Sequence, residues 1–165
     1  MKSGVLLLAH GAPERVEDVP EYLSHVRGGQ PVSAHVLEEV RSRYTAIGGS
    51  SPLTHWTRVQ AEALQQILGM PVFFGMRNWH PFVKETMQQV RAAGIERLAC
   101  LCLAPQFSEM SIGLYMRHTQ TAAESSMRFG VFQMHSQSIE ACQETYGPLA
   151  RFRWPCRPFG SRWPG

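Results

Sequence analysis

An uninterrupted apolar run near the N-terminus constrains the fold most strongly. The stretch G-V-L-L-L-A-H-G-A-P, Gly4–Pro13, contains Val5–Leu8 with no polar alternation, which predicts a strand buried on both faces of a parallel sheet. Gly11 and Pro13 end the strand. Ligands of open α/β sheets collect beyond the carboxyl ends of the strands, so His10 stands where a site would be built. The alternative is that His10 only caps the strand.

Further apolar runs alternate with amphipathic stretches along the chain. Strands are predicted at Pro71–Met76, Leu98–Ala104 and Gly130–His135, and helices at Ser33–Ile47, Thr54–Leu68, Pro81–Ala93 and about Ser111–Met127, with a short helix that Asp18 caps. In Thr54–Leu68 the apolar residues at helical spacing are Trp56, Val59, Ala63, Leu64 and Ile67. Strands separated by helices predict right-handed crossovers, hence a three-layer α/β domain with a parallel sheet of about four strands.

Composition bounds the class of protein. A chain of 165 residues has room for one core and not for a second full domain. The formal net charge is +3, but four arginines follow Glu144, so the body of the chain is near neutral and lacks the basic footprint of a nucleic-acid binder. The first apolar run is shorter than a signal-peptide core, and no stretch is long enough to span a membrane. We therefore expect a cytoplasmic protein.

Four cysteines, Cys100, Cys102, Cys142 and Cys156, would be reduced in that compartment. Cys100 and Cys102 lie in L-A-C-L-C-L-A, where the period of a strand places both thiols on one face. No second cysteine pair with metal-site spacing accompanies them, so core packing is the preferred interpretation.

Residues 141–165 differ from the rest of the chain. They mix proline, glycine, arginine and tryptophan without period, which predicts neither a helix nor a regular strand. This composition resembles a shifted reading frame or a degenerate terminus; the alternative is an aromatic, basic tail that binds a partner. We therefore predict a folded domain over residues 1–140 and an irregular tail over residues 141–165.

The segment I-G-G-S-S-P-L-T-H-W-T-R-V-Q-A-E-A-L, Ile47–Leu64, is the most informative. A helix ends at a glycine pair, small hydroxyl residues follow, and Pro52 leads into the next helix; such a loop can wrap an anionic group or simply connect two helices. The segment closely resembles the I-G-G-x-S-P-L-x-x-x-T-x-x-Q-A-x-x-L run of ferrochelatases. Three further stretches fall in the family's order: the N-terminal run to Leu23, G-M-R-N-W-H-P-F at Gly75–Phe82, and L-A-P-Q-F-S at Leu103–Ser108.

This resemblance implies a fold and an activity. Ferrochelatases insert ferrous iron into a porphyrin, coproporphyrin III or protoporphyrin IX, in haem biosynthesis, and the chain looks most like the bacterial coproporphyrin branch. The family has two similar Rossmann-like halves with a porphyrin cleft between them, and this sequence resembles the N-terminal half. The family's metal- and proton-handling histidine and glutamate lie in the second half, in and beyond an S-A-H-S-L-P-like run that this sequence lacks. Whether the chain turns over by itself is therefore open.

The resemblance also implies site residues. His10 occupies the place of a tyrosine or methionine that faces the centre of the macrocycle, and a neutral imidazole there is a candidate axial ligand for iron. Arg27, Arg43, Ser51 and Tyr115 resemble cleft or rim residues, where cations meet porphyrin carboxylates. His80 is a weaker metal candidate. Iron and porphyrin enter as substrates, and no permanently bound cofactor is expected.

The remaining histidines are assigned to less specific roles. His25, His35, His55 and His118 are expected on solvated helix faces, and His135 at a strand end. No G-x-G-x-x-G or P-loop follows a strand, which disfavours a nucleotide-binding domain. Three hypotheses stay open: a ferrochelatase working as a homodimer or with a complementing C-terminal half, a porphyrin- or haem-binding half-domain without normal turnover, and an inactive truncated product.

Overall fold

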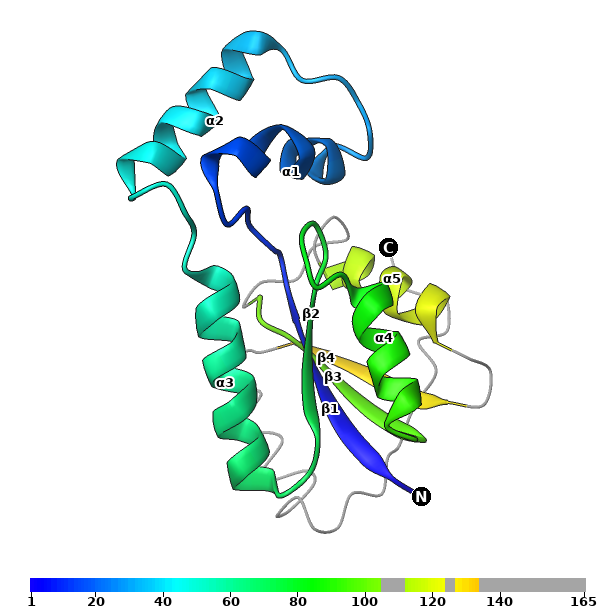
Figure 1. Ribbon diagram of the computed structural model, residues 1–165. Helices are drawn as coiled ribbons and strands as arrows, with labels where there is room; N and C mark the ends of the chain where they lie inside the picture. The colour runs from blue at the N-terminus through cyan, green and yellow to red at the C-terminus, as the bar shows by residue number, and fades with distance from the viewer. Residues whose placement is uncertain (105–111, 124–126, 134–165) are drawn as a thin grey trace, which may run out of the picture.

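A four-stranded parallel sheet forms the centre of the molecule (Figure 1). The computed structural model describes residues 1–104, 112–123 and 127–133. Within them the strands are β1 (Ser3–Ala9), β2 (Val72–Met76), β3 (Arg97–Cys102) and β4 (Arg128–Gln133), in the order β2-β1-β3-β4. All three neighbouring pairs are parallel, with Ala9 opposite Met76 at the end of the β1–β2 pair. The predicted α/β class and parallel sheet are confirmed.

Helices cover both faces of this sheet. Helix α3 (Leu53–Leu68) lies on one face, and α4 (Val83–Ala92) and α5 (Leu114–Ala122) lie side by side on the other (Figure 1). Successive side chains of a strand point to opposite faces. Leu6 and Leu8 of β1 therefore pack in the core under α4 and α5, while Val5 and Leu7 pack in the core under α3. The result is the predicted three-layer arrangement.

Helix α3 turns an unexpected face toward the sheet. Thr57 and Ala61 are buried, whereas Trp56, Val59 and Ile67 are exposed, Ile67 to 80%. Ala61 belongs to the same core cluster as Val5 and Leu7, and small residues at this position let the helix backbone approach the strands closely. The apolar spacing predicted the helix correctly, but not which side of it is buried.

After β1 the chain leaves the sheet and forms a helical excursion before it reaches α3. It contains a 3-10 turn at Val16–Asp18, α1 (Val19–Val26) and α2 (Ala34–Ala46), which lie beyond the end of the sheet (Figure 1). Leu37, Val40 and Tyr44 of α2 pack against a small apolar cluster built on α1 and Trp79. This second core holds the excursion over the edge where ligands of α/β sheets bind.

The C-terminal part of the fold departs from prediction in its boundaries. Helix α5 is shorter than the predicted 111–127, because Ala123 has extended backbone angles and Met127 already leads into β4. Strand β4 begins two residues before the predicted Gly130. His135, Cys142, Cys156 and the predicted tail, residues 141–165, lie outside the described residues.

The two described cysteines are structural. Cys100 and Cys102 are buried on one face of β3, in the core under α4 and α5. Burial raises the pKa of both thiols, that of Cys102 to about 12, so neither forms a thiolate near neutral pH. The core-packing interpretation is confirmed. None of the helices in the described residues has both the length and the apolar character needed to cross a membrane.

Candidate functional site

The loops after β1 and β2 run side by side at the carboxyl edge of the sheet. The parallel pairing continues past the strands, since the amide of Arg77 donates to the carbonyl of Ala9 at 3.0 Å and the amide of Asn78 donates to that of His10 at 3.0 Å. These bonds bring residues far apart in the sequence into one site: His10 from the first loop, and Arg77 and Asn78 from the second.

His10 is held by Asn78. The Asn78 side-chain amide donates to the His10 carbonyl at 3.1 Å and lies 3.2 Å from Nε2 and 3.4 Å from Nδ1 of the imidazole. Asn78 is itself buried, so its position is well constrained. Partial burial of the ring, and then the positive charge of Arg77, lower the pKa of His10. The imidazole is therefore neutral at neutral pH, although the residue reaches the surface.

Gly11 makes this arrangement sterically allowed. Its φ is +86°, a left-handed conformation, and a Cβ at this position would lie 2.8 Å from the backbone nitrogen of Trp79. Only glycine accepts both conditions at low cost. The glycine after His10 thus lets the two loops approach each other.

One aromatic ring, that of Tyr22, packs on His10 from the excursion side and belongs to a larger aromatic cluster. Tyr22 of α1 meets the imidazole edge to face at 6.4 Å between ring centroids, and it meets Trp79 at 6.3 Å and Tyr44 at 6.4 Å. Burial and the neighbouring Tyr44 raise the pKa of Tyr22 to about 12, so its phenol stays protonated. Tyr22 and Trp79 are buried, so they form a neutral apolar support beside the imidazole, and His10 is the exposed member of this group.

Arg77 supplies the positive charge of this edge. Its guanidinium lies 5.8 Å from the centroid of the Tyr115 ring, a cation–π distance. Tyr115 is buried, which raises the pKa of its phenol to about 12. Of the predicted site residues, Tyr115 is thus linked to His10 through Arg77, which faces both.

Ser51, Arg27 and Arg43 lie farther out. The amide of Ser51 donates to the carbonyl of Pro13 at 3.4 Å, which places it beside the loop that follows His10, and its hydroxyl accepts from Leu53 at the start of α3. Arg27 ends α1 and is exposed. Arg43 is exposed on α2 and pairs with Glu39. The two cations are on the excursion, as rim residues would be, and no described contact joins either of them to His10.

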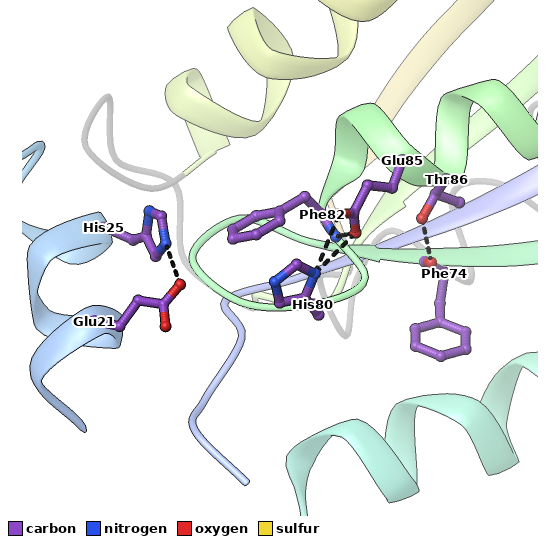
Figure 2. A network of polar contacts seen from close by, with 7 residues as sticks. All are labelled: Glu21, His25, Phe74, His80, Phe82, Glu85 and Thr86. Atoms are coloured by element: carbon purple, nitrogen blue, oxygen red, sulfur yellow. Dashed lines mark hydrogen bonds and ion pairs between the residues drawn. The ribbon is translucent and has the colours of Figure 1, made fainter. Parts of the chain in front are cut away.

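His80 is oriented by helix α4. Its Nδ1 lies 3.1 Å from the Glu85 carboxylate, which also accepts from the amide of Phe82 at 2.7 Å, and its ring packs on Phe82 at 4.4 Å (Figure 2). Glu85 therefore caps the start of α4 and also orients the His80 ring. The imidazole keeps only Nε2 for any further ligand.

The other described histidines are exposed, as expected, although His25 has a carboxylate partner, Glu21, one helical turn before it. His25 lies 3.8 Å from the Glu21 carboxylate and packs on the Phe82 ring at 5.0 Å (Figure 2). Partial burial, Arg77 and Arg117 lower the pKa of His118. His35 and His55 are exposed on α2 and α3. Across the described residues no three His, Cys, Asp or Glu side chains are placed to hold a metal ion together.

Comparison with known proteins identifies the family of the chain. The family model named Ferrochelatase matches residues 2–140, which is most of the chain. The chain belongs to the ferrochelatase family. The resemblance of its four motifs is thereby confirmed, and the parallel sheet is consistent with the family's Rossmann-like domain.

Several curated ferrochelatases are similar to it. The ferrochelatase of Acidobacterium capsulatum is 46% identical over 132 residues, 80% of this chain and 40% of that protein. The coproporphyrin III ferrochelatases of Anoxybacillus flavithermus and Oceanobacillus iheyensis are 37% and 33% identical, over 77% and 74% of this chain and 42% of each relative. This ferrochelatase-family chain thus spans about two fifths of the length of the curated relatives it matches.

Two residues of the candidate site are not among those that the sequence predicted. Arg77 and Asn78 lie within the G-M-R-N-W-H-P-F motif, yet neither was singled out. Their place directly after β2 was a usable signal, because β1 and β2 both end at the carboxyl edge where His10 was expected. Tyr22 and Trp79 had no comparable signal, since their meeting depends on how the excursion folds back.

Proposed function

We propose that this chain forms one wall of a porphyrin cleft and serves iron insertion in haem biosynthesis, with His10 as the ligand that faces the macrocycle centre. The observation that carries the proposal is the neutral imidazole of His10, anchored by Asn78 at the carboxyl edge of the sheet. A neutral imidazole is a good ligand for iron, and a lowered pKa keeps it unprotonated below the usual histidine range.

The Asn78 contact defines how ligation would proceed. A neutral imidazole has one ring lone pair, and the Asn78 amide nitrogen lies within 3.4 Å of both ring nitrogens. An iron ion held by His10 would use that lone pair, and the amide-to-ring contact would then give way to it. The second contact, from the amide to the His10 carbonyl, stays available and keeps the loop in place.

Two sets of side chains support a porphyrin as the substrate. Tyr22 packs edge to face on the His10 ring and is itself buried against Trp79, so an apolar cluster supports the imidazole that would face a macrocycle. Arg27 and Arg43 place exposed cations on the excursion, where porphyrin carboxylates would meet them. We propose coproporphyrin III or protoporphyrin IX as the porphyrin and ferrous iron as the second substrate.

Binding without normal turnover is the second candidate function. The match covers about two fifths of the relatives' length. Metal insertion also needs a base that removes two pyrrole protons, and the family resemblance assigns that role to its second half. On this alternative the chain binds porphyrin alone, and iron insertion requires a homodimer or a complementing C-terminal half.

Ferric coproporphyrin III is the direct probe of His10. We expect titration of the wild-type chain to shift the porphyrin absorption band, and His10→Ala to remove that shift and weaken binding by about tenfold or more, on the order of 1.4 kcal/mol. His35→Ala is the matched control, because His35 is exposed on α2. An unchanged spectrum and affinity in His10→Ala would exclude the ligand role.

Iron insertion separates the two candidate functions. We expect slow conversion of coproporphyrin III and ferrous iron by the chain as a monomer, followed in the visible spectrum under anaerobic conditions. Faster conversion at higher protein concentration would indicate a working dimer, and faster conversion on adding the second half of a relative would indicate complementation. Fast turnover by a monomer of verified mass would contradict the half-domain proposal.

A further inference from the structure

The side-chain amide of Asn78 has a partner at each of its two ends. Its nitrogen contacts His10 at the carbonyl oxygen (3.1 Å) and at the imidazole, 3.2 Å from Nε2. Its oxygen, Oδ1, accepts a hydrogen bond from Nε of Arg77 at 3.4 Å. Asn78 is only 3% exposed, so water offers little replacement for a partner that is lost.

These contacts determine which way the amide points. With its oxygen and nitrogen exchanged, Oδ1 would face the carbonyl oxygen of His10, and the amide N–H groups would face the Nε–H of Arg77. Acceptor would then oppose acceptor, and donor would oppose donor, in a buried place where unpaired polar groups are costly. Asn78 is consequently a donor toward His10, and the neutral imidazole meets it with a lone pair rather than with an N–H.

Arg77 is itself held in place from two sides. Its main-chain amide donates to the carbonyl of Ala9 at 3.0 Å, and its guanidinium lies 5.8 Å from the centroid of the Tyr115 ring. Tyr115 is 2% exposed, so it acts on the site through Arg77 rather than through surface of its own. A guanidinium combines stacking on a ring with an N–H of fixed direction, which an ammonium group does not. A chain of contacts thus runs from α5 through Arg77 and Asn78 to His10.

We propose that Arg77 is a positioning residue, which through Asn78 keeps the lone pair of the His10 imidazole on Nε2. Nε2 is the ring nitrogen nearer to the donating amide, at 3.2 Å against 3.4 Å for Nδ1. The neutral ring therefore carries its proton on Nδ1. The use of this lone pair for iron rests on the proposed function, in which Nε2 becomes the ligating atom; the tautomer itself does not depend on a porphyrin.

The ring-nitrogen NMR resonances of His10 in the porphyrin-free chain test the inference, at about pH 8, where the imidazole is neutral. We expect Nε2 to be the unprotonated nitrogen. Arg77→Lys keeps the positive charge but loses the Nε–H, so it should raise the population protonated on Nε2 and speed hydrogen exchange of the Asn78 side-chain amide. Arg58→Lys is the matched control, because Arg58 also lies over an aromatic ring, that of Phe74, at 5.9 Å. It should leave both measurements unchanged.

The same substitution in an Asn78→Ala background shows whether Arg77 acts through Asn78. There we expect Arg77→Lys to cause no further change in the His10 resonances, whereas a direct effect of charge or packing would persist. Three results would each overturn the proposal: a proton on Nε2 in the wild-type chain, the wild-type tautomer in Arg77→Lys, or the same change in both backgrounds. The first of these needs no variant, so the proposal stays falsifiable even where Arg77→Lys does not fold.

Ferric coproporphyrin III separates this inference from the proposed function. Arg77→Lys should weaken axial ligation, read from the absorption spectrum, by about threefold or more, because partners that orient a ligating histidine usually contribute roughly tenfold or more and Arg77 acts one contact farther out. An altered tautomer in Arg77→Lys, without ligation by the wild-type chain, would contradict the proposed function and support the positioning role. An unaltered tautomer would contradict the positioning role, whatever the porphyrin does.

Discussion

The side-chain amide of Asn78 contacts His10 twice, at its carbonyl oxygen (3.1 Å) and at its imidazole (3.2 Å to Nε2). The main-chain amide of Asn78 donates to the same carbonyl at 3.0 Å. One residue of the β2–α4 loop therefore determines both the path of the chain after β1 and the orientation of the ring. The candidate site depends on this long-range pair more than on any single side chain.

Replacing Asn78 should affect His10 in two different ways. Asn78→Ala removes the amide contacts, and we expect it to lower the free energy of unfolding by about 1–2 kcal/mol. Asn78→Asp places a carboxylate beside the imidazole and should raise the pKa of His10, because a nearby negative charge favours the protonated ring. Urea unfolding measures the first effect and imidazole resonances the second. An unaltered His10 pKa in Asn78→Asp would mean that the two side chains separate in solution.

The stability of the protein should fall as the pH drops below the ordinary histidine range. The folded-state pKa values of His10 and His118 are lowered, so below about 6.5 the unfolded chain binds protons that the folded chain does not. The free energy of unfolding then decreases with decreasing pH until the folded-state pKa values are passed. Urea unfolding between about pH 5 and 7.5 measures this slope, which His10→Asn and His118→Asn should each reduce. A slope that neither variant changes would assign the effect to other groups.

Gly11→Ala should be markedly destabilising. The left-handed φ alone costs on the order of 1–2 kcal/mol for a residue with a Cβ, and the new methyl group would also meet the Trp79 backbone. Gly28→Ala is the control, since Gly28 has a φ of +61° with no atom within 4 Å of an added Cβ. Thermal melting should rank Gly11→Ala well below Gly28→Ala. Equal melting temperatures would show that the two loops are not in close contact.

Two alanines of α3 test which face of the helix is buried. Ala61 packs in the core under α3, whereas Ala63 is exposed. Ala61→Leu should overpack that core and cost about 1–3 kcal/mol, while Ala63→Leu should change stability by less than about 0.5 kcal/mol. Urea unfolding compares them. The reverse order would mean that the helix is rotated to bury Trp56 and Val59 instead.

Several features of the protein follow from the sequence by itself. The apolar run at Val5–Leu8 and the stretch at Leu98–Ala104 predicted buried parallel strands, because an uninterrupted apolar strand must be covered on both faces. The position of His10 at the carboxyl edge followed from the same argument. These are local properties: side-chain period and backbone sterics act over a few residues, so a short stretch carries enough information to predict them.

Only the tertiary structure decided which side chains meet. Asn78 reaches His10 because β1 pairs with β2 in the register that sets Ala9 opposite Met76. Helix α3 buries Thr57 and Ala61 rather than Trp56, since the close approach of helix to sheet selects small residues over large ones. Both outcomes depend on contacts between segments dozens of residues apart. Local periodicity does not encode them, because such contacts are selected by the packing of the whole domain.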